Sequence, residues 1–189
     1  VGGTNGKGST GACLEALLKA AGLKVGLFTS PHLISFRERI RIDSALIDEA
    51  EACTVAGRVF ETAERGGIAP SFFEAAWAMA AVAFARAKVD VAIFEVGLGG
   101  RLDATNVCDP VASGIASIGL DHTHVLGETL EAIAAEKAAI YRPGRPALTS
   151  ATGAGLEALQ SVYPAVEVVP AVEVELPLPG AHMQRNAGL

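Results

Sequence analysis

A run of glycine, hydroxyl and lysine residues opens the chain at positions 2–10 (GGTNGKGST). Glycines let successive backbone N–H groups turn toward a phosphate, and a helix that starts just after them adds its dipole. Lys7 would offset charge near the β- and γ-phosphates. The common pattern G-x-x-x-x-G-K-[ST] is not met literally, because Val1 replaces its first glycine and Gly8 separates Lys7 from Ser9. We predict a phosphate-binding loop; a flexible glycine-rich turn is the alternative.

Two oxygen-bearing side chains stand at the ends of expected strands. Glu95 lies near the end of the apolar run 89–96 (VDVAIFEV), and Ser30 follows the run 24–29 (KVGLFT). Ligands bind at the carboxyl ends of strands in open α/β sheets, and an acid there can hold Mg²⁺. Alternatively, Glu95 is a surface acid and Ser30 a turn residue before Pro31.

Lys137 lies in an expected helix among alanines at 134, 135, 138 and 139. Small neighbours allow close packing, and a buried lysine has a lowered pKa and reacts as a free amine. The alternative is an exposed helix lysine beside Glu136, which the sequence alone favours.

His122 and His124 could together suggest a zinc site. No cysteine or third histidine is placed to complete a tetrahedral set, so we discount zinc. An isolated histidine at a strand end is more often structural.

The elements that would position these residues alternate between helices and strands. Alternation of this kind predicts βαβ units, and therefore an α/β fold with a doubly wound, mostly parallel sheet. Helices are expected over about 9–21, 48–64, 71–87, 129–140 and 153–162, with another starting after Gly180. Strands are expected over 24–29, 39–42, 89–96, 111–118, 147–149, 165–169 and 173–178.

Composition narrows the class of protein. A chain of 189 residues, half of them hydrophobic, fits one domain with a proper core. The net charge of −6 argues against a nucleic-acid partner, and no apolar run approaches the roughly 18 residues of a membrane span. The three cysteines, Cys13, Cys53 and Cys108, form no C-x-x-C pair and indicate reduced cytosolic thiols.

The ends of the sequence suggest a fragment. Val1 is not an initiator methionine, and Gly2 already opens the loop, so we expect the preceding strand to be missing and the first loop glycines to be untethered.

Several short motifs follow one another along the chain. They are GTNGKGST at 3–10, TSPHL at 29–33, FRERI at 36–40, SFFE at 71–74, EVGLGGRLDATN at 95–106, DH at 121–122, EKA at 136–138, and GAH at 180–182 followed by Asn186. In their sequence and order, these motifs resemble those of the folylpolyglutamate synthase/dihydrofolate synthase family of the Mur ligase superfamily.

The resemblance implies a P-loop NTPase-like Mur ligase central domain and a set of site residues. It implies two Mg²⁺ ions, one held by Ser30, Glu95 and His122 and the other by a carbamylated Lys137. Lys7, His122 and Lys137 would be catalytic. Pterin contacts would come from Ser71, Phe73 and Asp103, while the loop 31–40 would shape the folate entrance. ATP contacts would come from Thr4, Asn5, Gly6, Lys7, Gly8, Ser9, Thr10 and Asn186.

The activity implied by the resemblance is ATP-dependent addition of L-glutamate to dihydropteroate or reduced folate through an acyl phosphate. Residues 1–178 would form the ATP-binding domain, without its first strand, and 179–189 would begin the link to a C-terminal glutamate-ligase domain. We expect a cytoplasmic monomer without nucleic-acid or membrane partners.

The chain departs from the family pattern at two places. The family's H-Q-x-x-N becomes His182-Met183-Gln184-Arg185-Asn186, and the segment between Thr149 and Gly180 is shorter than usual. The alternatives are a Mur-type ligase for another carboxylate and a non-catalytic nucleotide-binding module.

Overall fold

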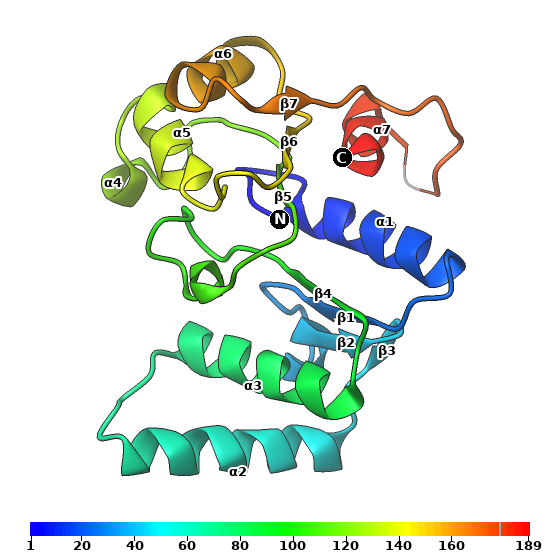
Figure 1. Ribbon diagram of the computed structural model, residues 1–189, viewed down its shortest axis with the longest axis vertical. Coiled ribbons are helices and arrows are strands. Elements are labelled where there is room, and N and C mark those ends of the chain that lie inside the picture. Colours follow the sequence, from blue (N-terminus) through cyan, green and yellow to red (C-terminus); the bar gives the residue numbers. More distant parts are fainter. Residues whose placement is uncertain (178) are drawn as a thin grey trace. The chain divides into compact units, whose positions relative to one another are not determined.

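The chain divides into two compact units in the computed structural model, which describes residues 1–177 and 179–189 (Figure 1). The first unit comprises Val1–Cys13 and Val96–Leu189, and the second comprises Leu14–Glu95. The predicted α/β class is confirmed, although the described strands form two sheets instead of one continuous sheet. None of the helices in the described part of the chain is long and apolar enough to cross a membrane.

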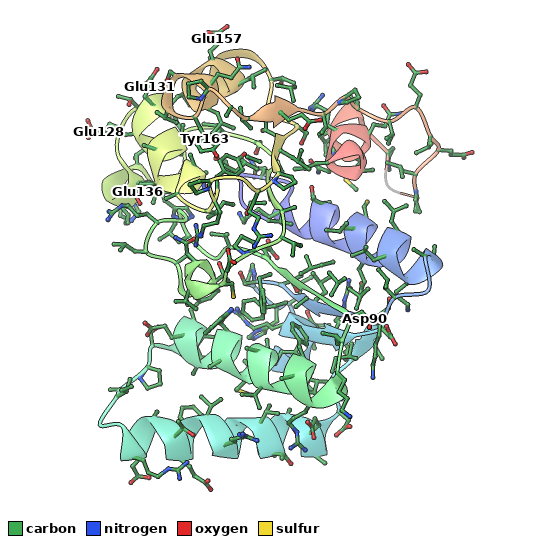
Figure 2. The ribbon with its side chains drawn as sticks, in the orientation of Figure 1. Asp90, Glu128, Glu131, Glu136, Glu157 and Tyr163 are labelled. Carbon is green, nitrogen blue, oxygen red and sulfur yellow. The ribbon has the colours of Figure 1, made fainter. Side chains whose placement is uncertain are left out.

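The second unit contains a four-stranded sheet in the order β3-β2-β1-β4. β1 pairs with β4 in parallel, whereas β1–β2 and β2–β3 are antiparallel. Asp90 precedes β4 (Figure 2), and its carboxylate accepts a hydrogen bond of 2.8 Å from the backbone N–H of Lys24, just before β1. The elements are α1 (Lys7–Ala20), which begins in the first unit, β1 (Val25–Phe28), the 3₁₀ helix η1 (Phe36–Arg39), β2 (Ile40–Ile42), β3 (Ala45–Leu46), α2 (Glu49–Arg65), α3 (Phe72–Ala87) and β4 (Val91–Phe94).

Helix α3 carries the core of the second unit and lies between α2 and the sheet (Figure 1). Ser71 and Glu74 form a capping box at its start, so each side chain satisfies a backbone N–H that the first turn leaves open. Trp77, on the same helix, packs against Phe94 with ring centroids 6.1 Å apart. The buried core consists of Phe28, Ile40, Ile47, Val55, Ala76, Met79, Ala80, Ala83 and Phe84.

The first unit contains a parallel three-stranded sheet in the order β5-β6-β7. Tyr163 (labelled in Figure 2) packs on Tyr141 with ring centroids 4.8 Å apart and ring planes tilted by 45°. The hydroxyl of Tyr141 donates to the carbonyl of Leu148 at 2.8 Å. The elements are η2 (Ala104–Val107), β5 (Ser113–Ile115), α4 (Thr123–Leu126), α5 (Leu130–Ala138), β6 (Ala147–Thr149), α6 (Gly153–Val162), β7 (Glu167–Val168) and α7 (Ala181–Gly188). The buried core consists of Val96, Ile115, Ala134, Ala138, Ile140, Tyr141, Ala147, Ala158, Leu159 and Val166.

Some predicted elements are shorter or missing. The strand expected over 111–118 is reduced to the three residues of β5. Of the strand expected over 173–178, residues 173–177 adopt no strand, and residue 178 lies outside the described residues. The two-residue strand β3 and the four-residue helix α4 were not expected, because elements this short leave no periodic pattern.

Two glycine substitutions in the second unit should change stability in opposite directions. Gly26→Ala should destabilise by about 1–3 kcal/mol, because its Cβ would lie 2.6 Å from the buried ring of Phe84. Gly57→Ala should stabilise by up to about 1 kcal/mol, because Gly57 lies inside α2 and an added Cβ there meets nothing within 4 Å. Thermal unfolding followed by circular dichroism checks both, and equal midpoints for the two variants would contradict the described packing.

Candidate functional site

The glycine loop has a backbone path that only glycine tolerates at two positions. Gly3 has φ +141° and Gly6 has φ +85°. A Cβ at Gly3 would lie 3.1 Å from the backbone nitrogen of Ser117, and one at Gly6 would lie 2.5 Å from the side-chain oxygen of Asn186. Helix α1 begins directly afterwards at Lys7, so its unpaired first N–H groups adjoin the loop. This arrangement suits an anion.

Contrary to the expectation, the first loop glycine is held firmly. Gly2 donates to the carbonyl of Gly114 at 2.8 Å and accepts from the N–H of Ala116 at 3.0 Å, which makes a parallel bridge with β5. The carbonyl of Val1 accepts from the N–H of Val96 at 2.9 Å. The expectation of untethered loop glycines is therefore wrong.

Two lysines converge on one carbonyl of the loop. The Nζ atoms of Lys7 and Lys137 lie 2.9 and 3.2 Å from the carbonyl oxygen of Gly3, and Lys7 also donates to the carbonyl of Thr4 at 3.3 Å. Lys137 is 5% exposed. Its burial, and next the charge of Lys7, lower the pKa of Lys137 to about 8. The buried amine with a lowered pKa is thus confirmed over the exposed helix lysine.

Asp103 uses its carboxylate to organise its own loop. One oxygen accepts the backbone N–H groups of Gly97 and Leu98, both at 3.0 Å. The other accepts the backbone N–H and the hydroxyl of Thr105, at 3.0 and 2.6 Å. A carboxylate has about four acceptor positions, so this loop occupies them all. A direct pterin contact through Asp103 stays a prediction.

The same loop is fastened to α5. Arg101 donates from its backbone N–H to the carbonyl of Glu136 at 2.9 Å, and its guanidinium pairs with the Glu136 carboxylate at 2.9 Å (Glu136 is labelled in Figure 2). A Cβ at Gly100 would lie 2.7 Å from the same Glu136 carbonyl. The loop backbone therefore lies directly on the helix that carries Lys137.

Arg142 makes a second connection between this loop and the end of α5. Its guanidinium donates to the carbonyl of Ala139 at 3.0 Å, to the carbonyl and side-chain oxygen of Asn106 at 2.7 and 2.8 Å, and to the carbonyl of Cys108 at 3.2 Å. The sequence analysis did not single out Arg142. No pattern signalled this role, because Asn106 and Cys108, its partners in the loop, lie more than 30 residues away.

Ser71 and Phe73, the other predicted pterin contacts, belong to the start of α3. The Ser71 hydroxyl accepts from the N–H of Glu74 at 3.3 Å as the helix cap. Phe73 packs edge-on against Phe28 at 5.7 Å, whereas Phe72 is 61% exposed and lies beneath the Arg39 guanidinium. The exposed aromatic ring of the motif is therefore Phe72. The S-x-x-E spacing could have signalled the capping box.

Ser30 and Glu95 are brought together in the second unit. The backbone N–H of Ser30 donates to a carboxylate oxygen of Glu95 at 3.0 Å, and Glu95 is 5% exposed. The buried guanidinium of Arg39 interacts electrostatically with Glu95, although burial is the stronger effect and lowers the pKa of Arg39. This negative charge lies just beyond β4, as predicted.

The loop before η1 is organised by a carboxylate that the sequence analysis did not single out. Glu38 accepts the backbone N–H groups of Leu33, Ile34 and Ser35 at 2.6–3.0 Å, and these bonds lower the pKa of Glu38. With Ser35 it forms a second capping box, again at S-x-x-E spacing.

His122 lies in the first unit with its side chain half exposed. It occupies the position before the first residue of α4 in a left-handed conformation, with φ +48°, and its side chain makes no capping bond. Its Nε2 lies 3.7 Å from a carboxylate oxygen of Asp121. The ring of His124 is 6.3 Å away. Within the described residues, no three His, Cys, Asp or Glu side chains gather into a metal-binding group. The metal role of His122 stays a prediction.

No family model matches the chain, but individual relatives do. It is 40% identical over 223 residues to a probable bifunctional folylpolyglutamate synthase/dihydropteroate synthase of Halobacterium salinarum, covering 100% of this chain and 27% of that protein. It is 47% identical over 148 residues to the dihydrofolate synthase/folylpolyglutamate synthase of Escherichia coli, covering 78% and 35%.

Solved structures agree over the whole chain. E. coli FolC in complex with DHPP and ADP superposes with a TM-score of 0.85 at 34% identity, covering 100% of this chain and 52% of that one. Folylpolyglutamate synthase of Thermotoga maritima gives 0.84 at 33% identity, covering 99% and 51%.

The chain spans about half the length of these solved chains and a smaller share of the curated relatives. Its strands, glycine loop and following helix define an α/β phosphate-loop fold of the Mur ligase type. The chain belongs to the folylpolyglutamate synthase/dihydrofolate synthase family.

Lys137 should make stability depend on pH in a defined window. Its pKa is about 8 when folded and 10.5 ordinarily, so between these values the unfolded chain binds the extra proton. The free energy of unfolding should therefore increase through Lys137 as pH rises from about 8 to about 10.5. This increase should be absent in Lys137→Met. Urea unfolding in CO₂-free buffer across this range measures the slope. Lys19→Met, at a surface lysine, is the control; parallel profiles for Lys137→Met and the wild type would contradict the burial.

Proposed function

We propose that this chain binds the nucleotide in an ATP-dependent ligase that joins L-glutamate to dihydropteroate or to a reduced folate. The observation that carries the proposal is the convergence of Lys7 and the buried Lys137 on the Gly3 carbonyl, at the start of α1. The names of the relatives support the substrates. One solved relative is described with DHPP and ADP, and another with Mn, AMPPNP and L-glutamate.

The loop fits the phosphates of ATP in three respects. The first N–H groups of α1 and the Lys7 ammonium supply positive charge. The hydroxyl of Thr10 is buried without a hydrogen-bond partner among the described residues, so a ligand oxygen could satisfy it. Asn186, on α7, lies against Gly6. The other proposed contacts are Thr4, Asn5, Gly8 and Ser9.

Ser30 and Glu95 fit a magnesium ion by their chemistry. Magnesium prefers oxygen ligands, and Glu95 is a buried carboxylate whose neighbour Ser30 adds a hydroxyl. When bound, the ion offsets phosphate charge during transfer. A contribution from His122 and a second ion are parts of the proposal that rest on the resemblance alone.

Lys137 is the proposed site of carbamylation. The uncharged amine is the form that reacts with CO₂, and the burial that lowers the pKa of Lys137 to about 8 increases its share near neutral pH. The product would be a carboxylate, which could help to hold the second ion. Lys7 would then face an anion instead of a second cation.

The proposed reaction proceeds through an activated acyl group. The γ-phosphoryl of ATP passes to a carboxylate of the pteroate or folate, and the amine of glutamate displaces phosphate from the acyl phosphate to form an amide. The chain's residues would position the phosphates and offset their charge. Asp103, Ser71 and Phe73 are the proposed pterin contacts; Asp103 would have to exchange a loop bond for a substrate bond.

We further propose a monomer that acts in the cytoplasm without nucleic acid or membrane partners; the net charge of −6 supports the absence of nucleic acid. Two alternatives predict other responses to the substrates. A ligase for another carboxylate would not use the pterin substrates, and a non-catalytic nucleotide-binding module would not respond to glutamate.

Glutamate incorporation onto dihydropteroate and onto tetrahydrofolate, measured separately in the complete natural protein, tests the proposal. Lys7→Ala should reduce either activity by at least about a hundredfold, because the phosphate charge loses its cation. Lys88→Ala, which removes an exposed lysine, should leave activity unchanged. Nucleotide hydrolysis indifferent to glutamate would favour the non-catalytic module, and near-normal activity in Lys7→Ala would refute the phosphate role of the loop.

Glu95→Gln tests the metal role separately. It keeps the size and one acceptor oxygen but removes the charge, so the Mg²⁺ concentration for half-maximal activity should rise about tenfold or more. Titration of activity with MgCl₂ measures this shift. Glu49→Gln, at an exposed acid of α2, is the matched control. A Mg²⁺ requirement equal to that of the wild type would rule Glu95 out as a ligand.

A further inference from the structure

The hydroxyl of Ser117 binds both polar groups of one loop residue. Its oxygen accepts the backbone N–H of Asn5 at 2.9 Å and donates to the backbone carbonyl of the same residue at 2.9 Å. Ser117 lies two residues after β5, more than 100 residues away in sequence. A single side chain therefore fixes the backbone in the middle of the glycine loop.

Neighbouring bonds strengthen this connection. The backbone N–H of Thr4 donates to the carbonyl of Ser117 at 2.8 Å. The Thr4 hydroxyl donates to the carbonyl of Gly119 at 3.1 Å and accepts the Gly119 N–H at 3.0 Å. Residues 4–5 are thus joined to 117–119 by several bonds, of which only those of the Ser117 hydroxyl reach Asn5.

Peptide planarity extends the effect of Ser117 to the two adjoining peptide groups. In a trans peptide, the N–H and C=O point in opposite directions. Because the Asn5 N–H points to Ser117, the Thr4 carbonyl points away from it, and there it accepts the Lys7 ammonium at 3.3 Å. Because the Asn5 carbonyl also points to Ser117, the Gly6 N–H points away from it.

We propose that Ser117 is a positioning residue for the nucleotide. It turns the Gly6 N–H and the Lys7-binding carbonyl of Thr4 to the side of the loop that receives the phosphates. Without the hydroxyl, both peptide groups around Asn5 lose their bond to Ser117, and the less restrained loop has to be reordered when it binds a phosphate. The ligand chemistry, a nucleoside di- or triphosphate, rests on the proposed function.

Calorimetric binding of ADP to the complete natural protein tests this role without requiring ligase activity. Ser117→Ala should weaken ADP binding about tenfold, the size expected for two lost hydrogen bonds. The KM for ATP should rise by a similar factor, while the KM for the folate substrate should stay within about twofold. Ser117→Thr keeps the hydroxyl and should restore most of the ADP affinity. Ser161→Ala, which removes a hydroxyl on α6 that bonds only within its own helix turn, should bind ADP like the wild type.

The outcomes separate positioning from a general structural role. The proposal is overturned if Ser117→Ala binds ADP as the wild type does. It is also overturned if the loss of ADP affinity in Ser117→Ala is accompanied by an equal rise in the KM for the folate substrate and if Ser117→Thr does not restore the ADP affinity. A wild-type protein that binds ADP but incorporates no glutamate would refute the ligase proposal alone. A wild-type protein that binds no ADP would refute both.

Discussion

The close approach of the glycine loop to β5 is the constraint on which the rest of the site depends. The loop can bond to the end of β5 and to Ser117 only because Gly3 carries no side chain, since a Cβ there would meet backbone nitrogens at 3.1–3.2 Å. This path aims the Gly3 carbonyl between the ammonium groups of Lys7 and Lys137. Two cations on one neutral oxygen repel each other, so the arrangement favours an incoming anion or the loss of one proton. Burial is the larger cause of the lowered pKa of Lys137, and the charge of Lys7 adds to it in the direction of the second response.

Lys137 keeps its buried place because α5 is held from outside. The loop that contains Arg101 and Asp103 lies on the helix backbone, and Arg142 ties the same loop to the residues after α5. A helix of nine residues is too short to be stable alone, so these contacts and the core beneath it determine where its lysine stands. Loop shape and amine burial are therefore parts of one packing arrangement.

Sequence patterns predicted the elements better than the environments of the side chains. The strand at 147–149 and the helix at 153–162 match β6 and α6, because turn signals bound each of them. Glu95 could be placed beyond a strand for a similar reason. The burial of Lys137, the bonds of Ser117 and the bonds of Arg142 to its loop depend on partners distant in sequence, and no local periodicity encodes those. The ring of Phe73, a predicted pterin contact, packs on Phe28, whereas the ring of the adjacent Phe72 is exposed, because adjacent helix residues point in different directions.

The aromatic side chains give the molecule two separate optical reporters. The only tryptophan, Trp77, packs on Phe94 within the second unit, while both tyrosines, Tyr141 and Tyr163, pack on each other in the first unit. Indole emission therefore responds to the melting of one unit, and phenol absorbance to the melting of the other. Comparing the two signals along one temperature ramp would show whether the units lose their structure together or in succession, without any added label.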